Sequence, residues 1–363
     1  MNGPRLSLLV DSPAFRARLR EDILIAREHV YVQTLSFEGD GAGRELTSLL
    51  LASGCPDRRL LVDTYSLVKV SDKFLYSPLR WGDRELFREW RRTGGFVREL
   101  RRDGVHVGFT NPMGPFLVRF PARNHKKLVV IDGRVAYIGG LNFSDHNFQW
   151  HDMMLRFDDP DLAQALRYDF EQTWGGRNLC MTKVTPGVEL HIFRGNANER
   201  RFQRILDLID DARDSIFVES AYVTFPFLDR LGAASRRGVE VTLVTPRENN
   251  FRVLRDYVAW ECHRHGIDLR LYPTMTHLKA MLIDGRVLVV GSTNFDFVSY
   301  RLEQEIVALV TDPDLVAEFR ACVLEPDLAV SLPAKPWIGG LRGRWRRAQL
   351  GAADLCARIL RGA

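Results

Sequence analysis

The chain has 363 residues, enough for two domains of ordinary size that each bury a hydrophobic core. Hydrophobic residues make up 45% of it and charged residues 27%, which is typical of a soluble globular protein and excludes a disordered chain. The formal net charge of +5 permits an anionic partner such as nucleic acid, a phosphate ester or an acidic membrane surface, but basic enzymes without such a partner are almost as common.

The five cysteines indicate a reducing compartment. They are odd in number and scattered, and no two form a C-x-x-C pair, so the sequence predicts neither a disulfide framework nor a zinc site. The first residues do not resemble a secretory signal, and no run of about 18 apolar residues could span a bilayer. We therefore expect a cytoplasmic protein without a transmembrane segment.

Strand-like and helix-like segments alternate along the first half. The expected strands are 6–10, 30–36, 59–63 and 105–109, and the expected helices are 13–28, 43–52 and 84–103. An aromatic and basic segment, 67–81, follows the third strand and has no counterpart later in the chain. This segment is either a lid or acceptor-site loop, or a plain surface loop.

The second half repeats the same order. Its expected strands are 189–193, 215–220, 239–244 and 267–272, and its expected helices are 198–212, 226–237 and 253–265. Such alternation predicts α/β domains, each with a mixed or parallel sheet flanked by helices. Pro and Gly interrupt the pattern near 183–187, so the expected domains are 1–185 and 186–334.

The last segment, 335–363, does not belong to the repeat. Six arginines accompany a single acid there, and apolar residues recur at steps of three and four, namely Leu341, Trp345, Ala348, Ala352, Leu355 and Ile359. The pattern predicts a basic amphipathic helix. It is expected either to lie in the surface of an anionic membrane or to dock on the protein with its arginines in solvent.

One eighteen-residue template occurs twice, at 125–142 and 277–294. Both copies read H-x-K, four residues, D, six residues, G-(G/S)-x-N. An Asp-Gly pair between two apolar runs predicts a hairpin, so the histidine and lysine share a face of its first strand. A repeated polar pattern of this kind predicts one active site built from two halves.

The chemistry of that site follows from its residue types. Packing about a pseudo-two-fold axis would combine two histidines, two lysines and two asparagines: His125, Lys127, Asn142, His277, Lys279 and Asn294. Lysines and asparagines suit phosphate oxygens, and two imidazoles can act as nucleophile and general acid near neutral pH. The set fits displacement at a phosphodiester without a metal or other cofactor. Asp132 and Asp284 complete the candidate catalytic set, although their turn position favours an architectural role.

The repeated template resembles the paired HKD motifs of the phospholipase D superfamily. The first copy, followed by Trp150 and Asp152, is most similar to the R-N-H-R-K, G-G-x-N and W-x-D elements of bacterial cardiolipin synthases. After the second copy, the family pattern N-x-D-x-R-S-…-E is followed at Asn294, Asp296, Ser299 and Glu305. Val298 and Glu303 depart from it, because they replace an arginine and an asparagine.

The resemblance implies two tandem phospholipase D-like α/β domains, each a mixed sheet flanked by helices, that are related by a pseudo-two-fold axis and share one active site. It also implies a ping-pong reaction through a phosphohistidine, with His125 as nucleophile and His277 as general acid in an order left open. Asp152 and Glu305 would orient the histidines at the substrate. Gly140 and Ser292 would form the phosphate seat with the two asparagines.

The leading functional prediction is a phosphatidyltransferase that converts two phosphatidylglycerols to cardiolipin and glycerol. Hydrolysis of phospholipids by the same residues is the alternative, and a superfamily nuclease is less favoured because the first motif block and the Trp345-bearing tail suit lipid. The expected partners are anionic phospholipids and the membrane surface, at the cytoplasmic face, with nucleic acid disfavoured and the oligomeric state left open.

Overall fold

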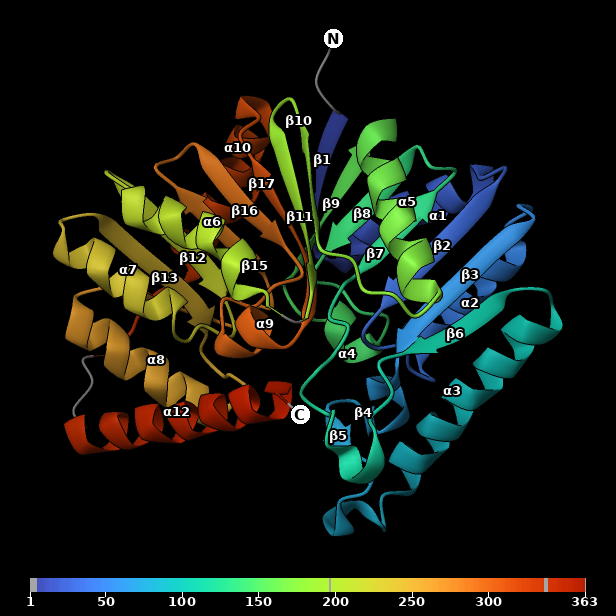
Figure 1. Cartoon of the computed structure of the whole chain (residues 1–363), viewed down its shortest axis with the longest axis horizontal. Coiled ribbons are helices and arrows are strands. Elements are labelled where there is room, and N and C mark those ends of the chain that lie inside the picture. Colours follow the sequence, from blue (N-terminus) through green and yellow to red (C-terminus); the bar gives the residue numbers. More distant parts are fainter. Residues whose placement is uncertain (1–4, 196, 336–338, 363) are drawn as a thin grey trace.

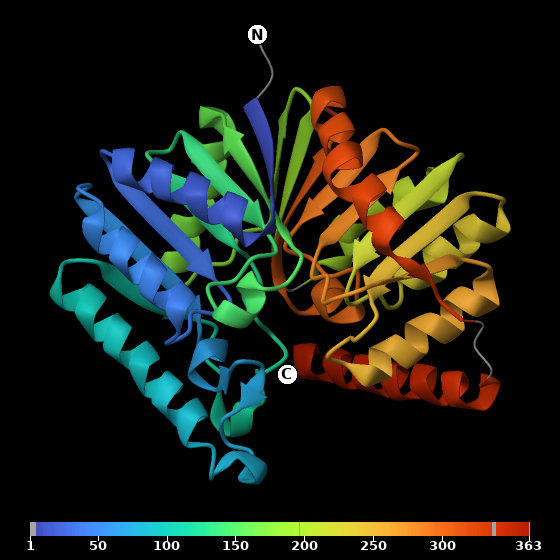
Figure 2. The same ribbon diagram turned by 180° about the vertical axis from the view of Figure 1, so that it is seen from behind.

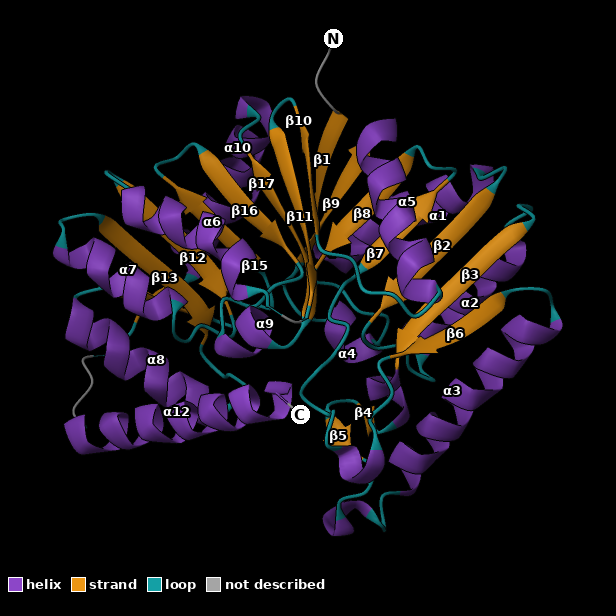
Figure 3. Ribbon diagram, viewed as in Figure 1, coloured by secondary structure: helices purple, strands orange, loops and turns teal. Residues whose placement is uncertain are grey.

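Two β-sheets lie side by side in the computed structural model, with helices on their faces (Figure 1; Figure 3). The structure describes residues 5–195, 197–335 and 339–362, and the side chains of Phe116 and of 360–362 lie outside the description. Within these residues, no helix is both long enough and apolar enough to cross a membrane.

The first half forms a seven-stranded sheet in the order β1-β9-β8-β7-β2-β3-β6. Its strands are β1 (Arg5–Val10), β2 (His29–Thr34), β3 (Asp57–Asp63), β6 (His106–Thr110), β7 (Leu128–Ile131), β8 (Val135–Gly139) and β9 (Met153–Asp158). Its helices are α1 (Asp11–Ile25), α2 (Gly41–Ala52), α3 (Arg84–Arg102), α4 (Asp145–Phe148) and α5 (Pro160–Trp174). A separate small hairpin joins β4 (Lys69–Val70) to β5 (Lys73–Phe74).

The second half forms a nine-stranded sheet in the order β10-β11-β17-β16-β15-β12-β13-β14-β18. Its strands are β10 (Met181–Thr185), β11 (Val188–Arg194), β12 (Ser215–Ser220), β13 (Glu240–Pro246), β14 (Asp268–Tyr272), β15 (Lys279–Ile283), β16 (Val287–Gly291), β17 (Gln304–Val310) and β18 (Leu332–Pro333). Its helices are α6 (Glu199–Asp211), α7 (Phe227–Arg236), α8 (Arg252–His265), α9 (Phe297–Arg301), α10 (Pro313–Phe319), α11 (Glu325–Val330) and α12 (Gly340–Gly362).

The two sheets repeat one topology. In each, the first five strands of the repeat pair antiparallel and the next two pairings are parallel, with β10 and β18 as additions at the edges of the second sheet. This arrangement confirms the α/β prediction of mixed sheets flanked by helices. The expected domain boundary at 183–187 falls inside the β10–β11 hairpin, so β10 belongs to the second sheet although the predicted first domain reached residue 185.

The halves share a hydrophobic core. One cluster of buried residues combines Leu155 and Phe170 of the first half with Leu190 and Ile306 of the second, whereas three other clusters belong to single halves. Seen from behind, α1 covers the first sheet and α10 and α11 cover the second, with β1 near the seam (Figure 2). The shared core holds the two sheets together. The motif residues lie at the edge of each sheet where its parallel strands end.

Candidate active site

Both copies of the motif form the predicted hairpins, β7–β8 and β15–β16. Asp132 and Asp284 begin the turns, with left-handed φ values of 52° and 49° that aspartate tolerates better than most residues. Their side chains point back along the sheet. Asp132 accepts backbone N–H bonds from residues 27, 28 and 29 at 2.9, 2.8 and 3.0 Å, and Asp284 accepts from residues 213 to 215.

These contacts favour the architectural role expected for Asp132 and Asp284 over a catalytic one. Neither lines the active-site pocket, and each carboxylate ties its hairpin turn to the start of the neighbouring strand, β2 or β12. Partial burial opposes ionisation, but the backbone N–H donors outweigh it and lower the pKa of both carboxyls. The turn aspartates are therefore structural.

The two histidines are each held by an acid from the opposite half. His125 Nδ1 lies 3.1 Å from Glu305 Oε1, and His277 Nδ1 lies 2.7 Å from Asp152 Oδ2. All four residues are buried. Because each carboxylate accepts a proton from Nδ1, each imidazole keeps a free Nε2 for chemistry.

Short backbone bridges across the seam enforce this crossed pairing. The His125 N–H donates to the Gln304 carbonyl at 2.9 Å, and the Gln304 N–H returns a bond to the Arg123 carbonyl. On the other side, the His277 N–H donates to the His151 carbonyl at 2.7 Å, and the His151 N–H donates to Met275. The bridging residues Gln304 and His151 directly precede the acids Glu305 and Asp152. Each histidine is therefore positioned both by a main-chain hydrogen bond and by the neighbouring acid side chain.

The lysines lie behind the histidines. Lys127 Nζ donates to the His125 carbonyl at 2.8 Å, and Lys279 Nζ donates to the His277 carbonyl while lying 2.9 Å from His277 Nδ1. Burial and then the Lys279 ammonium lower the pKa of Lys127 to about 7, and burial lowers that of Lys279 to about 8. Two buried ammonium groups match the charge of a phosphate-sized anion, but neither lysine is among the residues that line the pocket itself.

The histidine pKa values respond to the same environment. Burial first, and then the Lys279 ammonium, lower the pKa of His277 to about 4, against the opposing effect of Asp152. Burial and Lys127 lower that of His125, against Glu305. Without a bound anion, both imidazoles are therefore neutral near pH 7. A bound phosphodiester anion would favour their protonation by screening the lysines.

The asparagines of the motif reach the pocket, whereas the Gly/Ser position does not. Asn142 and Asn294 both line the cavity, and the buried Oδ1 of Asn294 has no protein partner. A Cβ at Gly140 would lie 2.1 Å from Asp152 Oδ1, so only glycine leaves room for this carboxylate. The Ser292 hydroxyl donates to Glu305 instead. The predicted phosphate seat thus divides into two asparagines at the pocket and two residues that position the acids.

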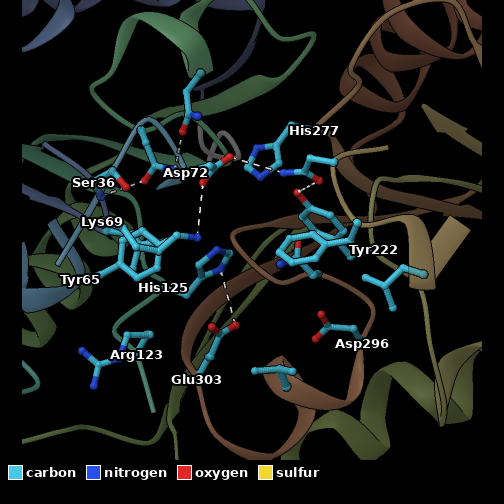
Figure 4. A pocket seen from close by; sticks show the side chains of 18 of the residues that line it. Ser36, Tyr65, Lys69, Asp72, Arg123, His125, Tyr222, His277, Asp296 and Glu303 are labelled. Atoms are coloured by element: carbon cyan, nitrogen blue, oxygen red, sulfur yellow. Dashed lines mark hydrogen bonds and ion pairs between the residues drawn. The ribbon is translucent and has the colours of Figure 1, made fainter. Parts of the chain in front are cut away.

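The pocket between the halves has a volume of about 350 Å³ (Figure 4). It is lined by both histidines and by residues that sequence reasoning did not assign, including Tyr65, Lys69, Asp72, Trp150, Tyr222, Asn250 and Phe297. Lys69 and Asp72 come from the non-repeating segment 67–81, and the figure shows them above His125. The absence of this segment from the repeat had already suggested a lid or acceptor-site loop as one of two alternatives.

Glu303, one of the departures from the family pattern, also faces His125. Its Oε2 lies 4.0 Å from His125 Nδ1, and burial and Glu305 raise its pKa well above the usual range. The ligand atoms of His125, Glu303 and Glu305 are close enough together for a metal ion. However, His125 Nδ1 is already committed to Glu305, and the nearby Lys127 ammonium opposes a cation, so we assign no metal here.

Comparisons of the sequence with known proteins agree with this geometry. A family model described as cardiolipin synthase, PLD-like domain, matches residues 19–174 and 205–323. The chain is 24% identical to cardiolipin synthase of Listeria monocytogenes, over 98% of this chain and 75% of the relative. It is 27% identical to cardiolipin synthase A of Salmonella paratyphi A, over 96% of this chain and 74% of the relative.

Solved structures share the fold. The phosphatidylserine synthase of Haemophilus influenzae superposes with a TM-score of 0.72 and 15% identity, covering 99% of this chain and 97% of that one. The polyphosphate kinase of Porphyromonas gingivalis superposes with a TM-score of 0.61 and 14% identity, covering 96% and 56%. With the matched family model spanning both motif-bearing halves, the chain belongs to the family of cardiolipin synthases with PLD-like domains and is an enzyme of the phospholipase D superfamily.

Proposed function

We propose that this enzyme transfers a phosphatidyl group from one phospholipid to the hydroxyl of another, with two phosphatidylglycerols giving cardiolipin and glycerol. The observation that carries the proposal is the crossed pair of histidines, each with an acid at Nδ1 and a free Nε2, in one pocket backed by two lysines. We place the reaction at the cytoplasmic face of a membrane, on a peripherally bound protein.

In the first step, His125 Nε2 attacks the phosphorus of the donor. The phosphorus–nitrogen bond forms as the bond to the leaving glycerol oxygen breaks, and His277 supplies the proton that this oxygen takes. Lys127, Lys279, Asn142 and Asn294 neutralise and hold the non-bridging oxygens. Glu305 stabilises the positive charge that His125 gains on attack.

In the second step, the acceptor hydroxyl occupies the place that glycerol has left. His277, now neutral, takes the hydroxyl proton while the acceptor oxygen attacks phosphorus and the phosphorus–nitrogen bond breaks. When the product leaves, both histidines return to their neutral forms, and His277 takes up its proton again as the next phosphodiester anion binds. Water in the acceptor's place would give hydrolysis by the same steps.

Transfer is favoured over hydrolysis by the lining of the pocket. Tyr65, Trp150, Tyr222 and Phe297 surround the histidines with aromatic surface. Such a lining suits an alcohol that carries apolar groups and disfavours ordered water. The departures at Val298 and Glu303 lie in this lining, so they bear on which donor and acceptor are accepted.

The test is incubation of the protein with phosphatidylglycerol vesicles, followed by mass spectrometry of the lipids. Cardiolipin and glycerol are the expected products. Phosphatidic acid without cardiolipin would indicate hydrolysis instead of transfer. Cleavage of DNA without any lipid product would contradict both lipid activities. The His125→Ala variant controls for contaminating lipid enzymes.

A further inference from the structure

Exposed apolar side chains gather on two segments at one end of the molecule. On the segment after β5, Leu79 is 93% exposed and Trp81 is 72% exposed. On α12, an outer stripe leaves Leu341 85%, Trp345 63% and Ile359 64% exposed, with Leu355 between them. We call these six side chains the rim surface. Large apolar groups exposed together in this way mark an interaction site.

The stripe on α12 is exposed because the opposite face of the helix is fixed to the protein. Arg342 and Arg346 form ion pairs with Asp256 of α8, and Arg347 pairs with Asp229 and Glu261. For Arg342, Arg346 and Arg347, these contacts correct the expectation that the tail arginines are merely solvated. The side chain of Arg361 lies outside the description.

Close packing sets the orientation of α12. Gly343 lies so near the Trp260 ring that a Cβ there would be 2.1 Å from it, and Leu350 and Ala357 are buried. Asp354 is buried too and pairs with Arg301. The helix therefore docks by a face of small residues and charge pairs, and it presents its apolar stripe outward.

Both parts of the rim surface lie beside the mouth of the active-site pocket. In both ribbon views, α12 and the β4–β5 region stand at the same end of the molecule, below the two sheets (Figure 1; Figure 2). Leu350, on the inner face of α12, and Asp72, in the β4–β5 turn, both line the pocket. A flat partner that covers the two segments would thus face the pocket directly.

The charge of the two segments selects the partner. Residues 73–92 carry six basic and three acidic side chains. On α12, four of the six arginines pair with acids of the protein, so most of the surplus positive charge lies on residues 73–92. Two copies of such a basic surface repel each other, whereas an anionic bilayer attracts it and accepts tryptophan and leucine into its interface.

We propose that the rim surface docks the protein on an anionic phospholipid bilayer, with α12 on one side of the pocket mouth and residues 79–81 on the other. The surface orients the pocket toward the headgroups, so that a donor lipid reaches the histidines without leaving the bilayer completely. This inference deepens the proposed function by naming the surface that delivers its substrates, but docking itself requires no turnover.

The test compares variants of the full chain in sedimentation with vesicles of phosphatidylglycerol and phosphatidylcholine. One variant replaces Leu341, Trp345, Leu355 and Ile359 by serine, and a second replaces Leu79 and Trp81. A matched control replaces Ile25 and Val184, which are each 68% exposed but lie outside the rim. We expect each rim variant to bind at least ~10-fold more weakly and the control to bind as the unchanged chain does.

Two further measurements keep the outcomes distinct. Turnover of a short-chain phosphatidylglycerol below its micelle concentration should survive in the rim variants, which shows that they fold. His125→Ala should bind vesicles normally, so that failure of the transfer chemistry is separable from failure of docking. Unchanged vesicle binding by both rim variants would overturn the proposal. So would a concentration-dependent dimer, seen by ultracentrifugation, that the rim substitutions abolish.

Discussion

The two halves of the molecule have one topology but different edges. Each contributes a hairpin with a histidine and a lysine, and each supplies the acid for the other half's histidine. Only the first half carries the β4–β5 insertion, and only the second carries a terminal helix against α8. The two additions lie on opposite sides of the pocket mouth.

The difference separates chemistry from access. A displacement at phosphorus needs similar groups on the attacking and leaving sides, so a duplicated half-site serves it well. The route of entry has no such symmetry, because donor and acceptor lipids come from one side only. Non-repeating segments therefore shape the entrance, while the repeat shapes the reacting centre.

The largest expected effect distinguishes the roles of the two histidines. His125→Ala and His277→Ala should each lower kcat for phosphatidylglycerol by at least ~10³-fold, because one removes the nucleophile and the other the general acid. With a p-nitrophenyl phosphodiester, whose leaving group needs little protonation, His277→Ala should recover activity and His125→Ala should not.

The reverse pattern of recovery would exchange the two roles. Appreciable turnover of phosphatidylglycerol by either variant would contradict the shared mechanism altogether. Circular dichroism and thermal melting of both variants provide the control for folding, since each histidine is buried at the seam.

A smaller effect is expected where the template has glycine in one copy and serine in the other. Gly140→Ser places a side chain where Asp152 Oδ1 stands, so it should displace this acid from His277 and lower kcat by roughly 10²-fold. Ser292→Gly removes one hydrogen bond to Glu305 and should cost about tenfold or less. Steady-state kinetics of the two variants at equal lipid concentration measure the contrast; equal losses would mean that the acids tolerate displacement similarly.

The residues that bridge the seam offer a third comparison. His151 donates to Asp11 and Asp327, at 2.8 and 2.9 Å, and its counterpart Gln304 bonds to Asn111. Burial opposes the charge of His151, but the two carboxylates prevail and raise its pKa to about 10. Only the first-half bridge is therefore charged.

A raised histidine pKa stabilises the folded state below the unfolded value near 6.5, and this contribution is lost as the pH rises toward 10. Stability should fall by up to about 1.4 kcal/mol per pH unit within this window, and His151→Gln should flatten the decline. Urea unfolding at several pH values from 6 to 10 measures it. An equal slope in the variant would assign the decline to other groups.

Much of this architecture could be predicted from the sequence because its signals are local. Apolar periodicity located the strands and helices to within a few residues, and each Asp-Gly pair marked a hairpin. The acids Asp152 and Glu305 were predicted from the resemblance to the family motifs. The sequence does not show which histidine each acid binds, because this pairing depends on how the two sheets pack and not on separation along the chain.

Sequence periodicity left two placements open for the last helix, and in the docked one its arginines were expected in solvent. The apolar stripe from Leu341 to Ile359 would ordinarily face the protein, yet α12 docks through arginines that meet acids more than 80 residues earlier in the chain. The side chains of the insertion could not be placed for a similar reason. Lys69 and Asp72 line the pocket only through the fold, and their local pattern did not distinguish an acceptor-site loop from a plain surface loop.

The smallest expected effect concerns the aspartates of the two turns. Asp132→Asn and Asp284→Asn each weaken several backbone hydrogen bonds at a solvent-accessible turn, so each should lower the free energy of unfolding by about 1 kcal/mol. Turnover should stay within about twofold, because neither side chain reaches the pocket. Because the pKa of each carboxyl is lowered in the folded state, its contribution to stability is present above the unfolded value near 4 and is lost in acid. The stability of the variants should therefore approach that of the unchanged chain as the pH falls. Thermal melting at pH 7 and pH 4 with matched kinetics measures both properties, and a loss of turnover comparable to that of the histidine variants would return these aspartates to the catalytic set.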